Sequence, residues 1–565
     1  MKALHLTYRF GRDIVGGAEH YMYMLSRALA DRGVEIDLWT TRTAALPAVS
    51  RFAVRWDNAL PAGRECVDGI EVRRYATFNL PGPIVRRLDR ALMAQWQREE
   101  RRPMPPLATP GTGYLDVGWY PPETHGALTM RWTEGRSGLV ICDHDVSEVC
   151  FEAMCPQRLE GRFEVNGELR GIFGTSAEWK QYRFRATGPD PIDAQIVLGA
   201  TWQPAGDPRR LGIAVRSVRY TVRGRERSID LGADRMRLLR RDRHVWLAHL
   251  EARAMARPWA HEAAFGLLRA PLAPGMLWDL ERKIATYDVV LAQMTPYTTV
   301  NYAVHFGRKH GVPVVLLPHF HLDDDFYHLR HYYQAFRDAA AVLAASDVQR
   351  AFFDKLGATS TLVGGGGVDP AEFRDTEPAA RAFRKRLGVG DVPLILFVGR
   401  KAGSKRYDAL IKAVDLLNEH LACRLVMIGP DEDGRPIASA NVVYLGRQER
   451  STVLAAYHAA DVFAMMSESE SFGIVFLEAW MARKPVVGSR ACAAVADLIA
   501  DGKDGFLCDD ELECAERIAE LILDRRLAEQ LGQAGYEKVM AGYTWDAIGA
   551  KVATLYDTLA SGARR

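Results

Sequence analysis

Short apolar runs separated by amphipathic segments predict an α/β fold from the start of the chain. Residues 2–7 form a short, mostly apolar run, and residues 17–33 carry apolar side chains at helical spacing until Gly33. Residues 34–41 form a second run of the first kind. A strand, a helix and a strand in this order give two parallel strands in one sheet.

The same alternation returns in the second half of the chain. Apolar runs at 287–294, 312–321 and 339–346 alternate with helical stretches such as 301–311. A Gly- and Pro-rich stretch at 363–378 is a hinge candidate, and a second series of strands and helices follows it. The pattern therefore predicts two Rossmann-like, doubly wound domains that face a cleft.

Between these halves the sequence changes character. From about residue 105 to residue 235, a Pro- and Gly-rich segment leads into short runs separated by turn signals. Such runs are typical of antiparallel strands, so we predict an inserted all-β domain, a sandwich or a jelly roll. The predicted organisation is an N-terminal domain of residues 1–104 and 270–375, the insert 105–235, a helical connector 236–269, a C-terminal domain 376–544 and a final helix 545–565.

Composition narrows the class of protein. Lys and Arg number 73 against 71 for Asp and Glu, and 48% of the 565 residues are hydrophobic. These values disfavour a disordered chain and a strongly basic partner of nucleic acid. The eight cysteines form no CxxC pair, which disfavours structural zinc and favours reduced thiols in the cytoplasm. The chain shows no signal-peptide core and no apolar stretch long enough to span a bilayer, so any membrane contact is expected to be peripheral.

Two glycines stand where the first strand should turn into the first helix. Gly16 and Gly17 precede Ala18 and Glu19. Glycine lets the backbone approach a ligand closely, and amide groups at a helix N-terminus favour an anion. The pair is not a GxGxxG dinucleotide motif, and a tight turn without a ligand is an equal alternative.

A pair of glutamates gives the strongest chemical signal. Glu470 follows an apolar run and stands just before a helix that contains Glu478. Amide groups near Phe472, Gly473 and Ile474 would point at one volume and suit a diphosphate. Glu478 would lie about 12 Å further along the helix, so the two carboxylates could reach sugar and ribose hydroxyls. The alternative is that both acids only complement a helix dipole or decorate its surface.

Two cations strengthen the functional interpretation. Arg400 directly follows the apolar run at 394–399, and Lys405 stands five residues further on. Doubly wound sheets bind ligands at the carboxyl ends of their strands, which is the predicted position of both cations. Fixed positive charge there could neutralise a diphosphate leaving group. Solvated surface charges remain the alternative.

Taken together, these motifs resemble the retaining GT-B glycosyltransferases of family 4. The matches are the Gly16–Glu19 turn, the run Gly366-Gly367-Val368-Asp369, Arg400 with Lys405, and the Glu470–Glu478 element. They occur in the family's order and cover about residues 1–100 and 275–565, without the β insert. This combination is far more specific than any one of its members.

The resemblance implies transfer of a sugar from a nucleotide donor, with retention of configuration and without an essential metal. It also implies that the final helix crosses back to the N-terminal domain. The implied catalytic residues are His319 and Glu470, where an imidazole could bond a sugar hydroxyl or relay the acceptor proton. The implied donor-binding residues are Gly16, Gly17, Arg400, Lys405, Phe472, Gly473, Ile474 and Glu478, and the acceptor-side candidates are His321 and Glu19.

Some features depart from the family's pattern or compete with it. Glycine replaces the family's Asn before Gly-Val-Asp, which predicts a looser interdomain turn within residues 364–367. The segment KAGS between Arg400 and Lys405 is also unusual. Asp323, Asp324 and Asp325 resemble the DxD metal motif of the other glycosyltransferase fold, but we interpret them as a solvated loop or a helix cap.

Two further features concern partners. The insert carries aromatic residues that could stack on sugars but more simply form its core: Trp119, Trp132, Trp179, Trp202, Tyr114, Tyr120 and Tyr182. Residues 84–102 and 235–257 are basic and amphipathic, so they fit an anionic membrane and an ordinary solvated helix face equally well.

The sequence therefore predicts a cytoplasmic retaining glycosyltransferase, peripheral to the membrane if it contacts one. We expect a UDP- or GDP-sugar donor, a glycan or lipid-linked glycan acceptor, no metal cofactor and no nucleic acid partner, in bacterial surface polysaccharide synthesis such as that of O-antigen or capsule. The alternatives are a GT-B nucleotide-sugar epimerase or hydrolase, and a non-catalytic glycan-binding scaffold. The sequence leaves the oligomeric state open.

Overall fold

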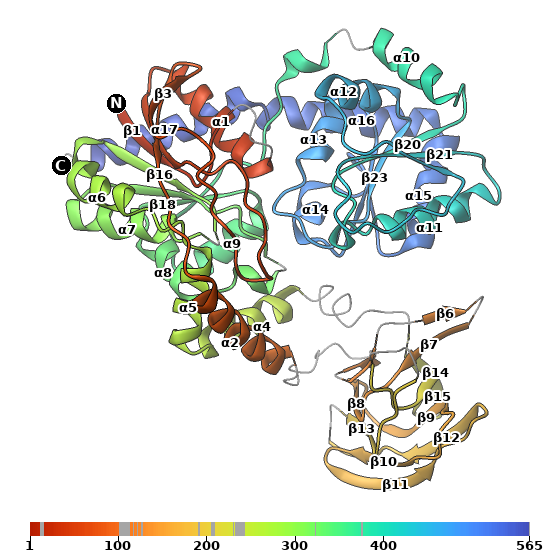
Figure 1. Ribbon diagram of the computed structural model, residues 1–565. Helices are drawn as coiled ribbons and strands as arrows, with labels where there is room; N and C mark the ends of the chain where they lie inside the picture. The colour runs from red at the N-terminus through yellow and green to blue at the C-terminus, as the bar shows by residue number, and fades with distance from the viewer. Residues whose placement is uncertain are drawn as a thin grey trace. The chain divides into compact units, whose positions relative to one another are not determined.

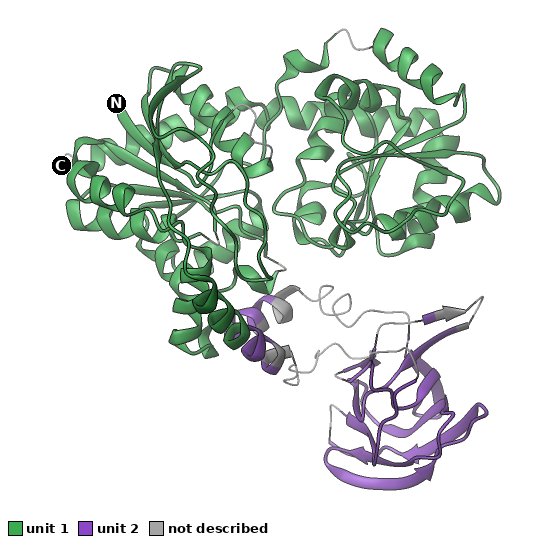
Figure 2. Cartoon of the chain, in the orientation of Figure 1, with its two compact units in different colours: residues 1–92, 254–565 green, residues 93–253 purple. Residues whose placement is uncertain are grey.

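The computed structural model describes residues 1–11, 16–100, 113–116, 118–120, 123–125, 128–189, 192–204, 209–229, 231, 243–295, 297–322, 324–374 and 377–563. Residues 1–92 and 254–565 form one compact unit, and residues 93–253 form a second (Figure 2). The domain boundaries predicted near residues 105, 235 and 375 lie outside the described residues.

An eight-stranded sheet, here called the N-terminal sheet, opens the first unit (Figure 1). Its order is β19-β18-β17-β16-β1-β2-β4-β3, and its neighbours are parallel except for β3 and β4. The predicted runs at 2–7 and 34–41 form β1 and β2, which pair in parallel as expected. The strands are β1 (Lys2–Leu6), β2 (Glu35–Thr41), β3 (Gly63–Val67), β4 (Ile70–Tyr75), β16 (Val289–Gln293), β17 (Val314–Leu317), β18 (Ala341–Ala344) and β19 (Ser360–Leu362).

Helices cover both faces of this sheet. On one face, α1 and α17 pack together over Ala3, Val289 and Leu291, because alternate strand residues point to the same side. Helix α7 packs against β16 and β17. The helices of this part are α1 (Gly17–Ala30), α2 (Gly82–Glu100), α5 (Trp259–Arg269), α6 (Pro274–Lys283), α7 (Thr299–His310), α8 (Arg330–Asp338), α9 (Asp347–Lys355) and α17 (Trp545–Ala563).

A six-stranded sheet, the C-terminal sheet, forms the rest of the first unit. Its order is β22-β21-β20-β23-β24-β25, with every neighbouring pair parallel. The strands are β20 (Leu394–Val398), β21 (Arg424–Ile428), β22 (Val442–Tyr444), β23 (Val462–Met465), β24 (Val486–Ser489) and β25 (Phe506–Cys508). The helices are α10 (Glu377–Leu387), α11 (Tyr407–Asn418), α12 (Arg450–Ala459), α13 (Ile474–Met481), α14 (Ala493–Leu498), α15 (Glu511–Leu523) and α16 (Arg525–Gly542).

The last helix of the chain belongs to the core of the N-terminal sheet. Ile548, Val552 and Tyr556 on α17 are fully buried and pack with Leu25 and Leu29 on α1. The chain therefore ends in the layer where it began. Within the described residues, no helix is both long and apolar enough to cross a membrane.

The second unit contains an antiparallel β sandwich. One sheet has the order β11-β10-β13-β8-β5, and the other has β12-β9-β14-β7-β6 with β15 beside β14. Residues from both sheets, such as Phe151 and Phe163, share one apolar core. The strands are β5 (Gly113–Leu115), β6 (Glu123–His125), β7 (Leu128–Trp132), β8 (Arg136–Ile141), β9 (Val146–Met154), β10 (Glu160–Val165), β11 (Glu168–Gly174), β12 (Lys180–Arg185), β13 (Ile192–Leu198), β14 (Ala214–Val222) and β15 (Arg225–Ile229).

Several aromatic residues of this sandwich support its core. Tyr114 and Tyr182 are buried, while Trp119 and Trp202 are partly buried against the apolar core. The Trp179 ring lies against the Arg216 guanidinium at 4.8 Å. Helix α4 (Arg243–Ala256) follows the sandwich and falls within the stretch predicted as a helical connector.

The glycine run at residues 364–367 is tightly packed, not loose as predicted. A Cβ atom on Gly365 would overlap the Cβ of Phe472 and lie 2.7 Å from that of Ala345, and one on Gly367 would lie 2.8 Å from Trp545. Gly364 has a left-handed backbone, with φ at +98°. The absence of side chains therefore lets this backbone approach its neighbours closely. The prediction of a looser turn considered only the lost Asn side chain and not this packing.

The first prediction concerns this run. We expect the G365A substitution to lower the melting temperature, because overpacking costs about 1–3 kcal/mol. Gly562 on α17 is a matched control, since a Cβ there would meet no atom within 4 Å. Differential scanning fluorimetry of both variants measures the effect. Equal melting temperatures for G365A and G562A would contradict the close packing.

Candidate active site

The carboxyl edges of the two sheets carry most of the candidate residues. Arg400 and Lys405 follow β20, and Glu470 follows β23, the neighbour of β20. In the N-terminal sheet, His319 and His321 follow β17. Parallel doubly wound sheets bind ligands at this edge, because the loops and helix N-termini that can contact a ligand gather there.

The two cations after β20 have different environments. The Lys405 Nζ lies 2.5 Å from Glu470 Oε1, and these side chains are only 12% and 13% exposed. The Arg400 guanidinium pairs with Glu432 at 2.9 Å, but these side chains are 54% and 44% exposed. An exposed pair contributes little free energy, whereas breaking a buried one is costly. Lys405 is therefore a fixed cation, and Arg400 can turn toward a ligand at small cost.

The N-terminus of α13 lies next to Glu470 in the chain. Gly473 precedes the helix with a left-handed backbone, φ +100°, and none of the described side chains caps the helix. The first amide groups of a helix have no partner within it, so an uncapped end suits an anion. Phe472 is buried, and Ile474 packs near the backbone of Gly366. The glycine run thus supports the turn that presents these amides.

Glu478 lies on α13 and is held in a hydrogen-bonded network. Its Oε1 accepts from Arg450 at 2.5 Å, and its Oε2 accepts from the Tyr457 hydroxyl at 2.7 Å. Arg450 also pairs with Glu372 at 2.7 Å. Burial together with the hydrogen bond and charge of Glu478 raises the pKa of Tyr457. The carboxylate is fixed in place and keeps lone pairs that could accept further hydrogen bonds.

His321 connects the two sheets of the first unit. Its Nδ1 lies 3.1 Å from Ser469 Oγ, which precedes Glu470, and its ring stacks on Tyr327 at 4.7 Å. Burial, with smaller contributions from the Lys405 and Arg400 charges, lowers the pKa of His321 to about 3. The imidazole is therefore neutral at pH 7 and lies close enough to both cations to be influenced by them.

His319 is held in one tautomer by Gln293. Thr7 Oγ1 donates to Gln293 Oε1 at 2.6 Å, and Gln293 Nε2 donates to the carbonyl of Ala18. The same amide lies 2.9 Å from His319 Nε2, which must therefore accept. The ring proton then sits on Nδ1. Burial lowers the pKa of His319 to about 3, so the ring is a neutral Nδ1–H donor.

The first turn of α1 is partly engaged within the protein. The buried Glu19 carboxylate accepts from Arg9, and a Cβ on Gly16 would overlap that carboxylate. A Cβ on Gly17 would meet no atom of the described residues within 4 Å. The glycine at position 16 is explained by internal packing, whereas no described neighbour explains the glycine at position 17.

Sequence reasoning missed several supporting residues. Gln293 ends an apolar strand, and a polar residue in that position is a signal that could have found it. Arg450 and Ser469 act through contacts that only the folded chain brings together. Lys401, within the unusual KAGS segment, is buried and pairs with Asp431 at 2.8 Å and with Asp433.

The acidic run after β17 has structural partners. Asp324 accepts from the backbone amide of Phe326 at 3.0 Å, and Asp325 pairs with Arg257 at 2.9 Å. Asp323 lies outside the described residues. In the part of the chain that the structure describes, no group of three or more metal-ligating side chains gathers.

The second prediction separates the two cations by stability. We expect K405M to lower the unfolding free energy by about 2–3 kcal/mol, because it leaves the Glu470 carboxylate unpaired. We expect R400M to change it by less than about 1 kcal/mol, because its pair is exposed. Adding E470Q to K405M should restore most of the loss. Thermal unfolding of all three ligand-free variants tests this, and equal effects of K405M and R400M would contradict it.

Comparison with known protein families gives a match for the part of the chain that contains the C-terminal sheet. Residues 380–538 match the family model described as Glycosyl transferases group 1. The chain is 33% identical over 206 residues to a GDP-mannose-dependent alpha-(1-6)-phosphatidylinositol monomannoside mannosyltransferase of Mycobacterium tuberculosis, covering 33% of this chain and 53% of that protein. It is 34% identical over 210 residues to a D-inositol 3-phosphate glycosyltransferase of Xylanimonas cellulosilytica, covering 34% and 49%. The chain thus spans about half the length of these curated relatives.

The overall architecture has a solved counterpart. The sucrose-phosphate synthase of Thermosynechococcus elongatus aligns with a TM-score of 0.52 at 14% identity, covering 99% of each chain. At this low identity, the similarity is evidence for the fold alone. The two sheets, parallel apart from the β3–β4 pair, and this similarity confirm the predicted GT-B fold. With that fold, the chain carries a domain of the glycosyl transferases group 1 family over residues 380–538.

Proposed function

We propose that the chain is a retaining glycosyltransferase that moves a sugar from a nucleotide-diphosphate donor to an acceptor. One observation carries this proposal. A fixed cation, a carboxylate and an uncapped helix N-terminus meet at the carboxyl edge of the C-terminal sheet, and His321 of the N-terminal sheet approaches them. These groups match the charge and hydrogen-bonding needs of a sugar diphosphate.

The diphosphate would bind the cations and the helix end. Lys405 would hold one phosphate from its fixed position, and Arg400 would leave Glu432 to contact the other. The free amides that follow Gly473 would add hydrogen bonds. As the bond to the sugar breaks, negative charge grows on the leaving diphosphate, and these groups would stabilise it most at that stage. Because two side-chain cations would supply the charge, we propose that no metal is needed.

The two glutamates would bind opposite ends of the donor. Glu470 would accept hydrogen bonds from sugar hydroxyls. Its ion pair with Lys405 would keep the carboxylate and the ammonium group in fixed positions relative to each other. Glu478, oriented by Arg450 and Tyr457, would accept from the ribose hydroxyls. Each carboxylate thus has an anchoring partner inside the protein and an acceptor site for the ligand.

His319 would donate a hydrogen bond to the donor sugar. Its Nε2 is occupied by Gln293, and its low pKa disfavours proton uptake. Of the two roles that the sequence suggested, these contacts support donation to a sugar oxygen over relay of the acceptor proton. Gln293 would be a positioning residue that keeps the proton on Nδ1.

For substrates, we propose a UDP- or GDP-sugar donor and a glycan or lipid-linked glycan acceptor. The mycobacterial relative is named as GDP-mannose-dependent and acts on a phosphatidylinositol mannoside. That similarity covers 33% of this chain and 53% of the relative, so the substrates of the whole chain remain part of this proposal. A role in bacterial surface polysaccharide synthesis, at the inner face of the membrane, fits these substrates.

The third prediction tests the donor site. We expect one of UDP, GDP or ADP to raise the melting temperature by several degrees, with or without EDTA, because a ligand of the folded state stabilises it. R400A should lose most of that shift, whereas R526A, an exposed arginine on α16, should keep it. The absence of any shift, or a full shift in R400A, would contradict the proposed site.

Assays of nucleotide-sugar turnover distinguish a transferase from a hydrolase and from a non-catalytic scaffold. With the matching nucleotide sugar, release of nucleoside diphosphate should require an acceptor and should be lost in E470Q. Release without an acceptor would indicate a hydrolase. Binding with no turnover under any condition would favour the scaffold.

The fourth prediction concerns Gln293. We expect Q293M to lower kcat by about tenfold, equivalent to ~1.4 kcal/mol, with little change in the donor KM, because His319 loses the partner that fixes its tautomer. The conservative T7S variant should retain activity, since its hydroxyl can still donate to Gln293. A purely structural role would lower the melting temperature and raise KM without the selective loss of kcat.

A further inference from the structure

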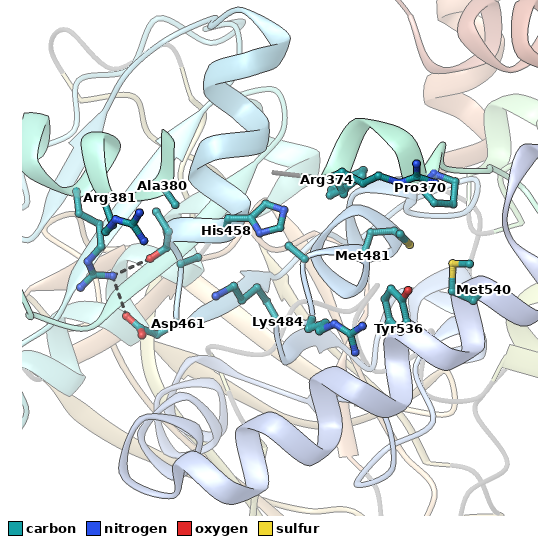
Figure 3. A pocket seen from close by; sticks show the side chains of 16 residues that line it. Pro370, Arg374, Ala380, Arg381, His458, Asp461, Met481, Lys484, Tyr536 and Met540 are labelled. Atoms are coloured by element: carbon teal, nitrogen blue, oxygen red, sulfur yellow. Dashed lines mark hydrogen bonds and ion pairs between the residues drawn. The ribbon is translucent and has the colours of Figure 1, made fainter. Parts of the chain in front are cut away.

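A pocket lies at the edge of the C-terminal sheet opposite to the candidate active site (Figure 3). It has a volume of about 680 Å³. In its lining, Asp461 directly precedes β23 and Lys484 stands two residues before β24, whereas Glu470 follows β23. Because all these strands are parallel, the pocket and the candidate active site lie at the two ends of the sheet. The proposed donor site around Lys405, Glu470 and the N-terminus of α13 is here called the donor cradle. The pocket belongs neither to this cradle nor to the N-terminal sheet.

The lining of this pocket is strongly basic. Five cations line it, and Asp461 is the only acidic residue among the lining residues. The cations are Arg374, Arg381, Arg384, Arg483 and Lys484. Since like charges at close range repel one another, this arrangement favours a ligand that brings negative charge.

Two of the charged groups, Arg384 and Asp461, pair with each other and bind the backbone. Arg384 donates to the carbonyls of Gly390, Ala459 and Val392, and its Nη1 lies 3.2 Å from Asp461 Oδ2. The same Asp461 oxygen accepts from the backbone amide of Leu394 at 2.8 Å. These contacts brace α10 against the sheet, and they leave Asp461 as one carboxylate among five cations.

Helix C-termini do not explain the remaining cations. Helix α13 ends at this pocket, and a negative helix end can attract basic side chains. Here three of its last four carbonyls, those of Glu478, Ala479 and Trp480, already accept from the backbone amides of residues 482–484. The side chains of Arg483 and Lys484 are therefore not required there as caps.

Among the described residues, three of the five cations lack an ion pair like that of Arg384 with Asp461. Within the described residues, Arg374, Arg483 and Lys484 form no ion pair with a carboxylate. Arg483 lies over the Tyr536 ring at 3.8 Å and donates to Gln533. Burial lowers the pKa of Lys484, and the neighbouring Arg384 charge acts in the same direction against the attraction of Asp461. A second ionised partner at Lys484 would relieve this unfavourable burial.

The pocket also has an apolar wall. Phe373, Met481, Tyr536 and Met540 line it together with the basic residues. In Figure 3, the Lys484 side chain lies between Asp461 and Tyr536, in the middle of the labelled residues. A ligand could therefore place an anionic group near Lys484 and a less polar portion against the aromatic and methionine side chains.

We propose that this pocket binds a phosphate group, either of a soluble phosphate compound or of an anionic lipid head group. Lys484 would contact the phosphate from within the pocket, and the guanidinium groups of Arg374 and Arg483 would contact it from the rim. Guanidinium and ammonium groups bind phosphate through charge-assisted hydrogen bonds, which are the strongest that side chains offer. The site is independent of the proposed donor cradle.

Competitive lysine labelling tests this site directly. The full-length protein is treated with trace acetic anhydride at constant ionic strength, and peptide mass spectrometry gives the labelling rate of each lysine. The probes are pyrophosphate, phosphatidylglycerol vesicles and phosphatidylcholine vesicles. Lys405 reports the donor cradle in the same sample, and Lys412, exposed on α11, reports non-specific effects. An absence of protection at Lys484 can therefore be distinguished from an absence of protection at Lys405.

We expect pyrophosphate or phosphatidylglycerol to slow the labelling of Lys484 at least fivefold while leaving Lys412 unchanged. Protection by pyrophosphate identifies a soluble phosphate compound, and protection by phosphatidylglycerol alone identifies a lipid head group. R374Q should raise the half-protecting concentration by about tenfold, the loss expected for one charge-assisted hydrogen bond. An unchanged Lys484 rate with all three probes, or equal slowing of Lys484 and Lys412, would overturn the proposal.

Discussion

The close approach of the glycine run to its neighbours is the contact on which the candidate site depends. Residues 364–367 lie against Phe472, Ile474 and Trp545, and the carbonyl of Gly364 accepts from the Tyr21 hydroxyl at 2.8 Å. One backbone segment thus touches α1, α17 and the turn before α13. The same turn carries Ser469 and Glu470, so its position decides whether His321 can reach Ser469. Side chains on this run would separate the groups that the chemistry needs together.

Electrostatic compensation then sets the character of each group at the site. The Lys405–Glu470 pair is nearly buried, so neither partner can move away without leaving an uncompensated charge. Arg400 has an exposed partner and can exchange it. The two histidines remain neutral because burial opposes their protonation. The result is one fixed cation, one adaptable cation and two neutral donors or acceptors around the same volume.

Much of this arrangement could be predicted from the sequence because it depends on local patterns. Apolar runs and helical spacing located β1, α1 and β2, and the glycines and glutamates located the turns before α1 and α13. What the sequence could not show is how distant side chains meet. The anchoring of Glu478 by Arg450 and Tyr457, and the control of His319 by Gln293, depend on tertiary contacts. The glycine run was misjudged because packing against it is invisible in a single sequence.

A structure of the protein with a nucleoside diphosphate bound would show whether Lys405, Glu470 and the start of α13 form the donor site. We expect the diphosphate within hydrogen-bonding distance of Lys405 Nζ and the amides that follow Gly473. We also expect that Arg400 leaves Glu432 to contact a phosphate and that Glu478 accepts from the ribose. A nucleotide bound elsewhere on the chain, with the Arg400–Glu432 pair intact and the end of α13 empty, would contradict this donor site.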